Sequence, residues 1–277
     1  GVHVLACDGR YRGVDTALNM EKVCIDLGNA VRHAKQKLGY RHVVLLGWSG
    51  GGSLSAFYQS QAENPTVTCS PCGAGPDLTK QDFIPADGLI LMAAHISRHG
   101  TLTQWIDASI TDETDPERRD PALDLYGEDI EPPYTQAFLE SYRTAQIARN
   151  RKITAWVKHK LQELADKGRE NEEFAFVTHG TMADPRWLDP AVDPNDRKPG
   201  WCYLGEPRIV NNGPVGLARF STLRSWLSRW SYDDANADGP KSLAHVTKPV
   251  LVVGNSADDA CTPSHTQALF EGVAHDN

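Results

Sequence analysis

Short runs of apolar residues recur along the chain, and helical patterns lie between them. Continuous apolar runs at residues 2–6, 42–46, 88–94 and 249–253 predict four buried strands. Runs of this unbroken kind are typical of a parallel sheet that is covered by helices on both faces. The alternation of strands and helices at both ends of the chain predicts an α/β fold with a mostly parallel sheet.

The predicted helices follow from spacing and from residues that start or stop helices. One apolar face repeats at the helical period after the first run, through Leu18, Val23, Leu27, Ala30 or Val31, Ala34 and Leu38. Asp15 is the predicted N-cap of this helix and Gly39 its C-terminal stop. Further helices are expected at residues 53–62 and 264–272.

The middle of the chain has a different pattern. Residues 96–245 are polar and contain tryptophans, with helical stretches at 134–149 and 151–168 and a region rich in Pro and Gly at 182–214. This segment separates two predicted sheet strands. We therefore expect residues 1–95 and 246–277 to form the sheet-containing core, and residues 96–245 to form an inserted cap or lid domain.

Composition limits the class of protein and of partner. The chain has 277 residues, a net charge of −8, 40% hydrophobic and 23% charged residues, which is ordinary for a globular protein. The acidic balance argues against a nucleic-acid partner or an anionic membrane surface. The apolar runs have the length of strands, so the sequence predicts no membrane span.

The six cysteines indicate little about chemistry. Cys69 and Cys72 have a C-x-x-C spacing, but the further ligands of a zinc site are not evident at comparable spacing. A chain of this length does not need disulfides. The default prediction is a cytoplasmic protein with reduced cysteines; a signal peptide could have stood before Gly1, because the sequence does not begin with Met.

The segment Gly47-Trp48-Ser49-Gly50-Gly51 joins the second predicted strand to the next helix. In this setting a G-x-S-x-G pattern predicts a nucleophile elbow, a strained turn whose neighbours must be small. The turn would present the Ser49 hydroxyl at the carboxyl end of the sheet and aim the Gly50 N–H at an oxyanion. The alternative is a Gly-rich turn that binds phosphate at a helix N-terminus; the Walker A pattern is absent from the sequence.

On this elbow, and on the segment Gly254-Asn-Ser-Ala-Asp-Asp-Ala-Cys-Thr-Pro263 after the fourth run, the chain resembles the α/β-hydrolase family. The resemblance covers residues 1–95 and 246–277, and it implies the α/β-hydrolase fold with a large, mainly helical cap. In that family the acid of the catalytic triad follows such a strand, commonly as Asp-x-x-x-Pro. Asp259 has this spacing to Pro263 and is the implied acid, with Asp258 as the alternative.

The resemblance also implies parts of the family's fold that residues 1–277 do not supply. The four predicted strands match the fourth to seventh of the family's sheet, so the earlier strands and a second oxyanion donor would precede Gly1. The catalytic histidine would follow Asn277. Among the histidines present, His95 and His99 follow the third predicted strand and are candidates to line the pocket, together with Trp48. His265 is expected to be a surface residue at the start of the last helix.

The sequence thus predicts a serine hydrolase that acts on an ester-like carbonyl of a small molecule, such as a carboxylic ester or lactone. Ser49 would form an acyl-enzyme, the Gly50 N–H would stabilise the oxyanion, and Asp259 would orient a histidine. This chemistry needs no metal and no organic cofactor. Two alternatives stay open: an acyltransferase of the same fold, and a non-catalytic α/β-hydrolase-fold protein that binds a small molecule or a partner. The oligomeric state is not indicated.

Overall fold

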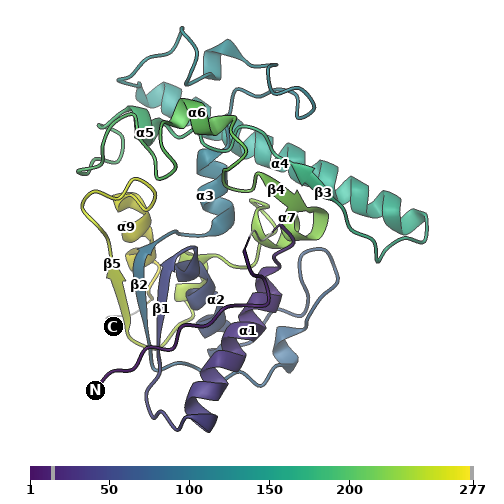
Figure 1. The fold of residues 1–277 in the computed structure, drawn as a ribbon, viewed down its shortest axis with the longest axis vertical. Coiled ribbons are helices and arrows are strands. Elements are labelled where there is room, and N and C mark those ends of the chain that lie inside the picture. Colours follow the sequence, from purple (N-terminus) through teal and green to yellow (C-terminus); the bar gives the residue numbers. More distant parts are fainter. Residues whose placement is uncertain (14–15, 275–277) are drawn as a thin grey trace.

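The central element of the computed structural model, which describes residues 1–13 and 16–274, is a three-stranded parallel sheet (Figure 1). Its strands are β1 (Val44–Ser49), β2 (Gly88–Ala94) and β5 (Val250–Val253), in the order β1-β2-β5. In the register of the sheet, Leu46 lies beside Ile90 and Ile90 beside Leu251. The chain therefore has an α/β fold, as its apolar runs predict.

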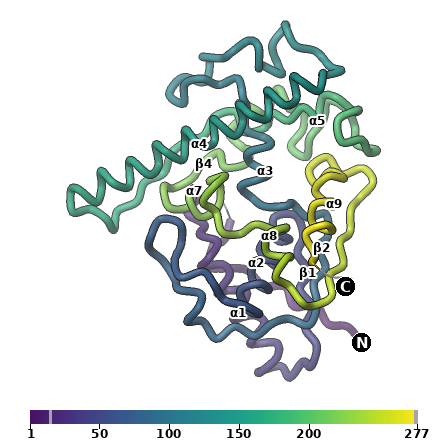
Figure 2. Tube along the Cα trace, turned by 180° about the vertical axis from the view of Figure 1, so that it is seen from behind, coloured from purple at the N-terminus to yellow at the C-terminus, as the bar shows by residue number. Residues whose placement is uncertain are grey.

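One face of the sheet is covered by helices. The helix α2 (Gly50–Glu63) packs on this face, and both α8 (Gly239–Leu243) and α1 (Met20–Arg32) pack against α2. Seen from behind, α2 and α8 lie in front of the strands (Figure 2). The core contains every second residue of the strands, because alternate side chains of a strand point to opposite faces. Its largest members are Met20, Phe57, Tyr58, Leu78, Leu89 and Leu91.

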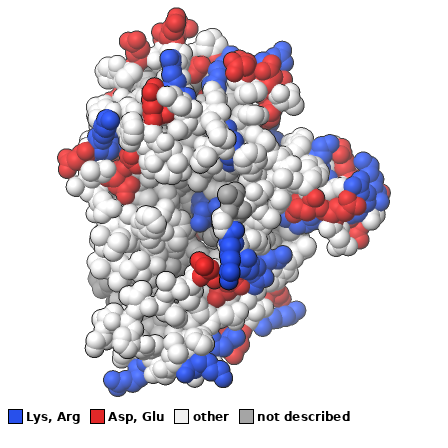
Figure 3. All heavy atoms as spheres, in the orientation of Figure 1, with Lys and Arg blue, Asp and Glu red and all other residues white. Residues whose placement is uncertain are grey.

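The opposite face of the sheet is largely uncovered in the described part of the chain. The β1 side chains Val44, Leu46 and Trp48 are 53%, 58% and 69% exposed, and Leu251 in β5 is 56% exposed. Uncharged atoms occupy the surface over these strands in Figure 3, while charged groups lie mainly elsewhere. The sequence prediction of a sheet covered on both faces is therefore met on one face only among the described residues.

A second layer of helices lies beyond the carboxyl ends of the strands (Figure 1). One long helix crosses this layer. Four of the seven tryptophans of the chain are fully buried in the layer. The elements of this layer are α3 (Arg98–Trp105), α4 (Gln136–Asp166), β3 (Ala175–Val177), α5 (Pro185–Leu188), α6 (Pro207–Asn211), β4 (Phe220–Thr222) and α7 (Leu223–Arg229). The last helix of the chain, α9 (Pro263–Glu271), packs beside β5 and β2. The remaining short helical segments are the π-helix η1 (His33–Lys37), which continues α1, and the 3-10 helices η2 (Leu78–Lys80) and η3 (Pro121–Leu123).

Three local predictions are corrected by the structure. Residues 2–6 form no strand: they pair with no described strand, and the Val2 and Val4 side chains are 94% and 91% exposed. The two helices predicted at 134–149 and 151–168 are the single 31-residue helix α4, because nothing at residue 150 interrupts it. The first helix begins at Met20 with Asn19 as its N-cap, and the predicted cap Asp15 lies outside the described residues.

None of the helices among residues 1–13 and 16–274 is long and apolar enough to cross a membrane. The longest, α4, carries charged residues along its whole length, consistent with a helix on the outside of a folded domain.

Candidate active site

Ser49 stands at the junction of β1 and α2 with a strained backbone. Its φ is 52° and its ψ is −123°, in a region that residues other than glycine rarely adopt. Such strain costs about 1–3 kcal/mol and persists only where the surrounding structure imposes it. The turn expected from the sequence is therefore present, and it places Ser49 at the carboxyl end of the central sheet.

The turn is imposed by close backbone packing around its glycines. A Cβ atom on Gly47 would lie 2.6 Å from the carbonyl oxygen of Gly51, and one on Gly52 would collide with the Cβ of Ala94 in β2. At Gly50 the Cβ would lie 2.8 Å from Cζ of Arg98. Small residues are required here because α2 leaves the sheet directly over β1 and β2.

This packing predicts opposite effects for two adjacent substitutions in α2. Gly52→Ala should lower the free energy of unfolding by about 1–3 kcal/mol, because the new methyl group meets a rigid neighbour. Gly51→Ala meets nothing within 4 Å, and should raise it by about 1 kcal/mol, since Ala is the better helix former. Urea unfolding monitored by circular dichroism measures both. Equal effects of the two variants would contradict the packing described here.

His95 follows β2 and is joined to the turn through the backbone. Its N–H donates to the carbonyl oxygen of Ser49 (3.1 Å), which ties the end of β2 to the end of β1. The side chain is 8% exposed and contacts Trp105 edge-on. Burial, with a smaller contribution from the charge of Arg98, lowers the pKa of His95 to about 4. The imidazole is therefore neutral at physiological pH.

The two acids after β5 have different surroundings. The Asp258 carboxylate accepts hydrogen bonds from the backbone N–H groups of Ala260 (2.9 Å) and Cys261 (2.7 Å), so it holds the loop in shape. The carbonyl oxygen of Asp259 accepts from Nε1 of Trp187 (2.7 Å), and its side chain is partly buried. Burial, and next the charge of Asp258, raise the pKa of Asp259. The two acids thus differ in what holds them: the Asp258 carboxylate binds the loop backbone, and Asp259 is held through its own carbonyl oxygen.

Arg186 on α5 connects the upper layer to this acid loop. It is 6% exposed, pairs with Asp184, and donates from Nη1 to Oγ1 of Thr262 (2.7 Å). Its Nη2 donates to Oε1 of Gln104 (2.6 Å), which stands near the end of α3. The same guanidinium lies 3.7 Å from Asp193. One buried cation therefore fixes the position of three segments around the loop.

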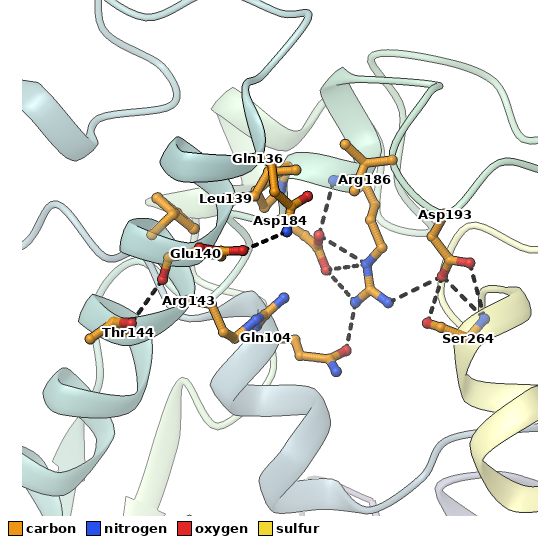
Figure 4. Close-up of a pocket in the computed structure, with 13 residues that line it drawn as sticks. Gln104, Gln136, Leu139, Glu140, Arg143, Thr144, Asp184, Arg186, Asp193 and Ser264 are labelled. Atoms are coloured by element: carbon orange, nitrogen blue, oxygen red, sulfur yellow. Dashed lines mark hydrogen bonds and ion pairs between the residues drawn. The ribbon is translucent and has the colours of Figure 1, made fainter. Parts of the chain in front are cut away.

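A cavity of about 520 Å³ opens beside Arg186 (Figure 4). It lies between α3, α4, α5 and the start of α9, and its polar lining residues are Gln104, Gln136, Glu140, Arg143, Thr144, Asp184, Arg186, Asp193 and Ser264. Within the described chain, Nη1 of Arg143 is buried and has no hydrogen-bond partner, and burial lowers the pKa of this side chain. Neither Ser49 nor Asp259 lines this cavity.

The structure brings together some of the predicted residues and adds others. Ser49, Gly50 and His95 adjoin one another at the ends of β1 and β2, while Trp48 points to solvent on the uncovered face of the sheet. His99 is buried, and its Nε2 lies 3.3 Å from Oδ2 of Asp238. His265, predicted to be a surface residue, is 1% exposed. That prediction is wrong because the upper layer covers the start of α9.

Arg186, Gln104 and Arg143 had no signal in the sequence that marks them as functional. They come from three helices, and only the fold places them around one space. The comparisons with known proteins add nothing to this picture: no family model, no curated protein and no solved structure matches the chain significantly.

Proposed function

We propose that the protein is a serine hydrolase of the α/β-hydrolase type, acting on an ester-like carbonyl of a small molecule with Ser49 as nucleophile. The observation that carries the proposal is the positive φ of Ser49 (52°) between a parallel strand and a helix N-terminus. A strained serine in this position is the defining geometry of a nucleophile elbow. A plain strand-to-helix turn does not need a strained residue other than glycine.

The start of α2 supports the proposed chemistry. Gly50 is the first residue of α2 and its N–H has no partner within the helix. The N-terminus of a helix carries partial positive charge, so this N–H can donate to the oxygen that becomes negative when Ser49 attacks a carbonyl. One such donor contributes about 3–4 kcal/mol to stabilisation of the transition state. Attack by Ser49 would form an acyl-enzyme, and water would then release the acid.

The acid loop supports a role for Asp259 as the residue that orients the general base. Asp259 follows β5, so it lies at the carboxyl ends of the strands, as Ser49 does, and it is partly buried. Two buried histidines, His95 and His265, direct ring nitrogens to Cys261 and Gln104. The proposal therefore assigns the general base to neither of these two histidines.

Fluorophosphonate labelling of the full-length protein tests this proposal. The probe reacts covalently with an activated serine, so we expect one label, located on Ser49 by peptide mass spectrometry. Ser49→Ala should abolish labelling, and Ser55→Ala in the same helix should leave it unchanged. Asp259→Asn should slow labelling by about 10³–10⁴-fold if it orients the base, and Asp258→Asn should slow it far less.

Circular dichroism of each variant separates loss of reactivity from loss of folding. A folded full-length protein that takes up no probe, or a Ser49→Ala variant that labels as the wild type does, would overturn the proposal. The first result favours a non-catalytic binding protein of the same architecture. If Asp258→Asn slows labelling and Asp259→Asn does not, the assignment of the acid moves to Asp258.

A further inference from the structure

Three side chains with metal-ligating atoms meet in the interior beside the acid loop. They are His95 after β2, Cys261 before α9 and His265 within α9, and their exposed fractions are 8%, 3% and 1%. The Cys261 Sγ lies 3.4 Å from Nδ1 of His95, and one nitrogen of each ring and the sulfur all lie within 4.8 Å of one another. The two imidazole centroids are 5.6 Å apart. Segments far apart in the sequence thus supply two nitrogens and one sulfur to a single buried point.

The hydrogen bonds around His265 fix which of its nitrogens carries the proton. Nη2 of Arg186 can only donate, so the atom of Gln104 that faces it at 2.6 Å is the carbonyl oxygen. The same oxygen lies 2.6 Å from Nε2 of His265, so this nitrogen donates to it as N–H; Nη1 of Arg186 lies 3.5 Å from the same nitrogen, a much longer contact. Nδ1 then bears the lone pair, and it is buried without a hydrogen-bond partner in the described chain. A histidine whose second nitrogen is held by a carbonyl oxygen is the usual arrangement of a metal ligand.

Charges of both signs surround the three side chains, and the guanidinium nearest to them is paired with carboxylates. The positive charge of Arg186 is balanced by Asp184 and Asp193 at its guanidinium. Asp258 adds a negative charge near His95 and Cys261, and Arg98 and Arg143 add positive charges near His95 and His265.

We propose that His95, Cys261 and His265 form a binding site for a single Zn²⁺ ion. A thiolate and two imidazoles are ligands that Zn²⁺ prefers, whereas Mg²⁺ and Ca²⁺ prefer oxygen. Three protein ligands leave a fourth position for water or another oxygen donor. On binding, the Cys261 thiol releases its proton to solvent, gives up its hydrogen bond to the carbonyl oxygen of Ala93, and bonds to the metal as thiolate.

The position of the site suggests what the ion does. It would link the end of β2 to the acid loop and to α9, and His95 is bonded through its N–H to the carbonyl oxygen of Ser49. A bound ion would therefore hold the acid loop against the end of the sheet. This role does not depend on the hydrolase proposal, and its test does not measure catalysis.

Titration of the reduced, metal-free protein with Co²⁺ tests the site, because Co²⁺ bound to a thiolate absorbs in the near ultraviolet by charge transfer. We expect one Co²⁺ per chain with this band, and its displacement by one equivalent of Zn²⁺. Cys261→Ser should abolish the band, while Cys24→Ser, at a buried cysteine in α1, should retain it. Gln104→Leu should weaken Zn²⁺ binding by about 10–100-fold, since it removes the group that orients His265.

His265→Asn gives a second measurement if Cys261→Ser does not fold, as judged by circular dichroism. This variant should keep the thiolate band at a higher Co²⁺ concentration and bind Zn²⁺ at least about 10-fold more weakly. The proposal is overturned if wild-type protein shows no thiolate band, if the band persists in folded Cys261→Ser, or if Cys24→Ser abolishes it. Binding that is unchanged in both His265→Asn and Gln104→Leu would equally exclude His265 as a ligand.

Discussion

Replacing Arg186 by Met should lower the free energy of unfolding by about 3–5 kcal/mol, the largest single effect that the structure predicts. Arg186 and Asp184 are 6% and 1% exposed, so the substitution leaves a carboxylate buried without its cation. It also removes the donors to Gln104 and Thr262. Guanidinium chloride unfolding, followed by tryptophan fluorescence and circular dichroism, measures the loss.

Two further variants test the reason for this effect. Arg151 also pairs with a carboxylate, that of Asp233, but its side chain is 57% exposed, so Arg151→Met should change stability little. Combining Arg186→Met with Asp184→Asn should recover part of the lost stability, because the buried side chain at position 184 then carries no charge. If Arg186→Met costs no more than Arg151→Met, the pair does not hold the layers together as described.

Replacing Glu21 by Ala should lower the free energy of unfolding by about 3 kcal/mol or more. This carboxylate is fully buried in α1 and accepts hydrogen bonds from Ser70 (2.9 Å), Ser228 (2.7 Å) and Asn236 (2.9 Å). Each buried donor left without an acceptor costs about 1–3 kcal/mol. The partners come from a loop, from α7 and from the segment before α8, so Glu21 joins the sheet layer to the upper layer.

The conservative change Glu21→Gln is the control for this prediction. It keeps one side-chain oxygen as acceptor and preserves the volume, so it should cost less than Glu21→Ala in the same urea titration. If Glu21 couples the two layers, the wild type should unfold with one urea midpoint by tryptophan fluorescence, which reports on the upper layer, and by far-ultraviolet circular dichroism. In Glu21→Ala the two midpoints should differ. Equal stability of Glu21→Ala and the wild type would show that solvent replaces the carboxylate at no cost.

The parts of the fold that local sequence determines were predicted well. The run at 88–94 is β2 at the same bounds, and the runs at 42–46 and 249–253 overlap β1 and β5. Their apolar residues are continuous and bounded by turn residues, which is a local signal. Residues 2–6 carry the same signal and form no strand, because a strand also needs a neighbour to pair with.

The candidate site likewise has one part that local sequence predicts and another that depends on residues far apart in the sequence. The turn at Ser49 is predicted by the five-residue motif together with the apolar run before it and the helix after it, which are all local in the sequence. The burial of His265, by contrast, depends on Gln104 and Arg186, which arrive from α3 and α5. The spacing Cys261-x-x-x-His265 is visible in the sequence, but it acquires a third member only when the sheet places His95 beside it.

The uncovered face of the sheet affects how the stability of the protein and its variants should be measured. In the described chain, β1 and β5 are both edge strands, and Leu46, Trp48 and Leu251 are exposed beside them. Unpaired backbone groups and apolar side chains at such an edge favour contact between molecules. Unfolding midpoints should therefore depend on protein concentration, since association of the folded chain adds to its apparent stability.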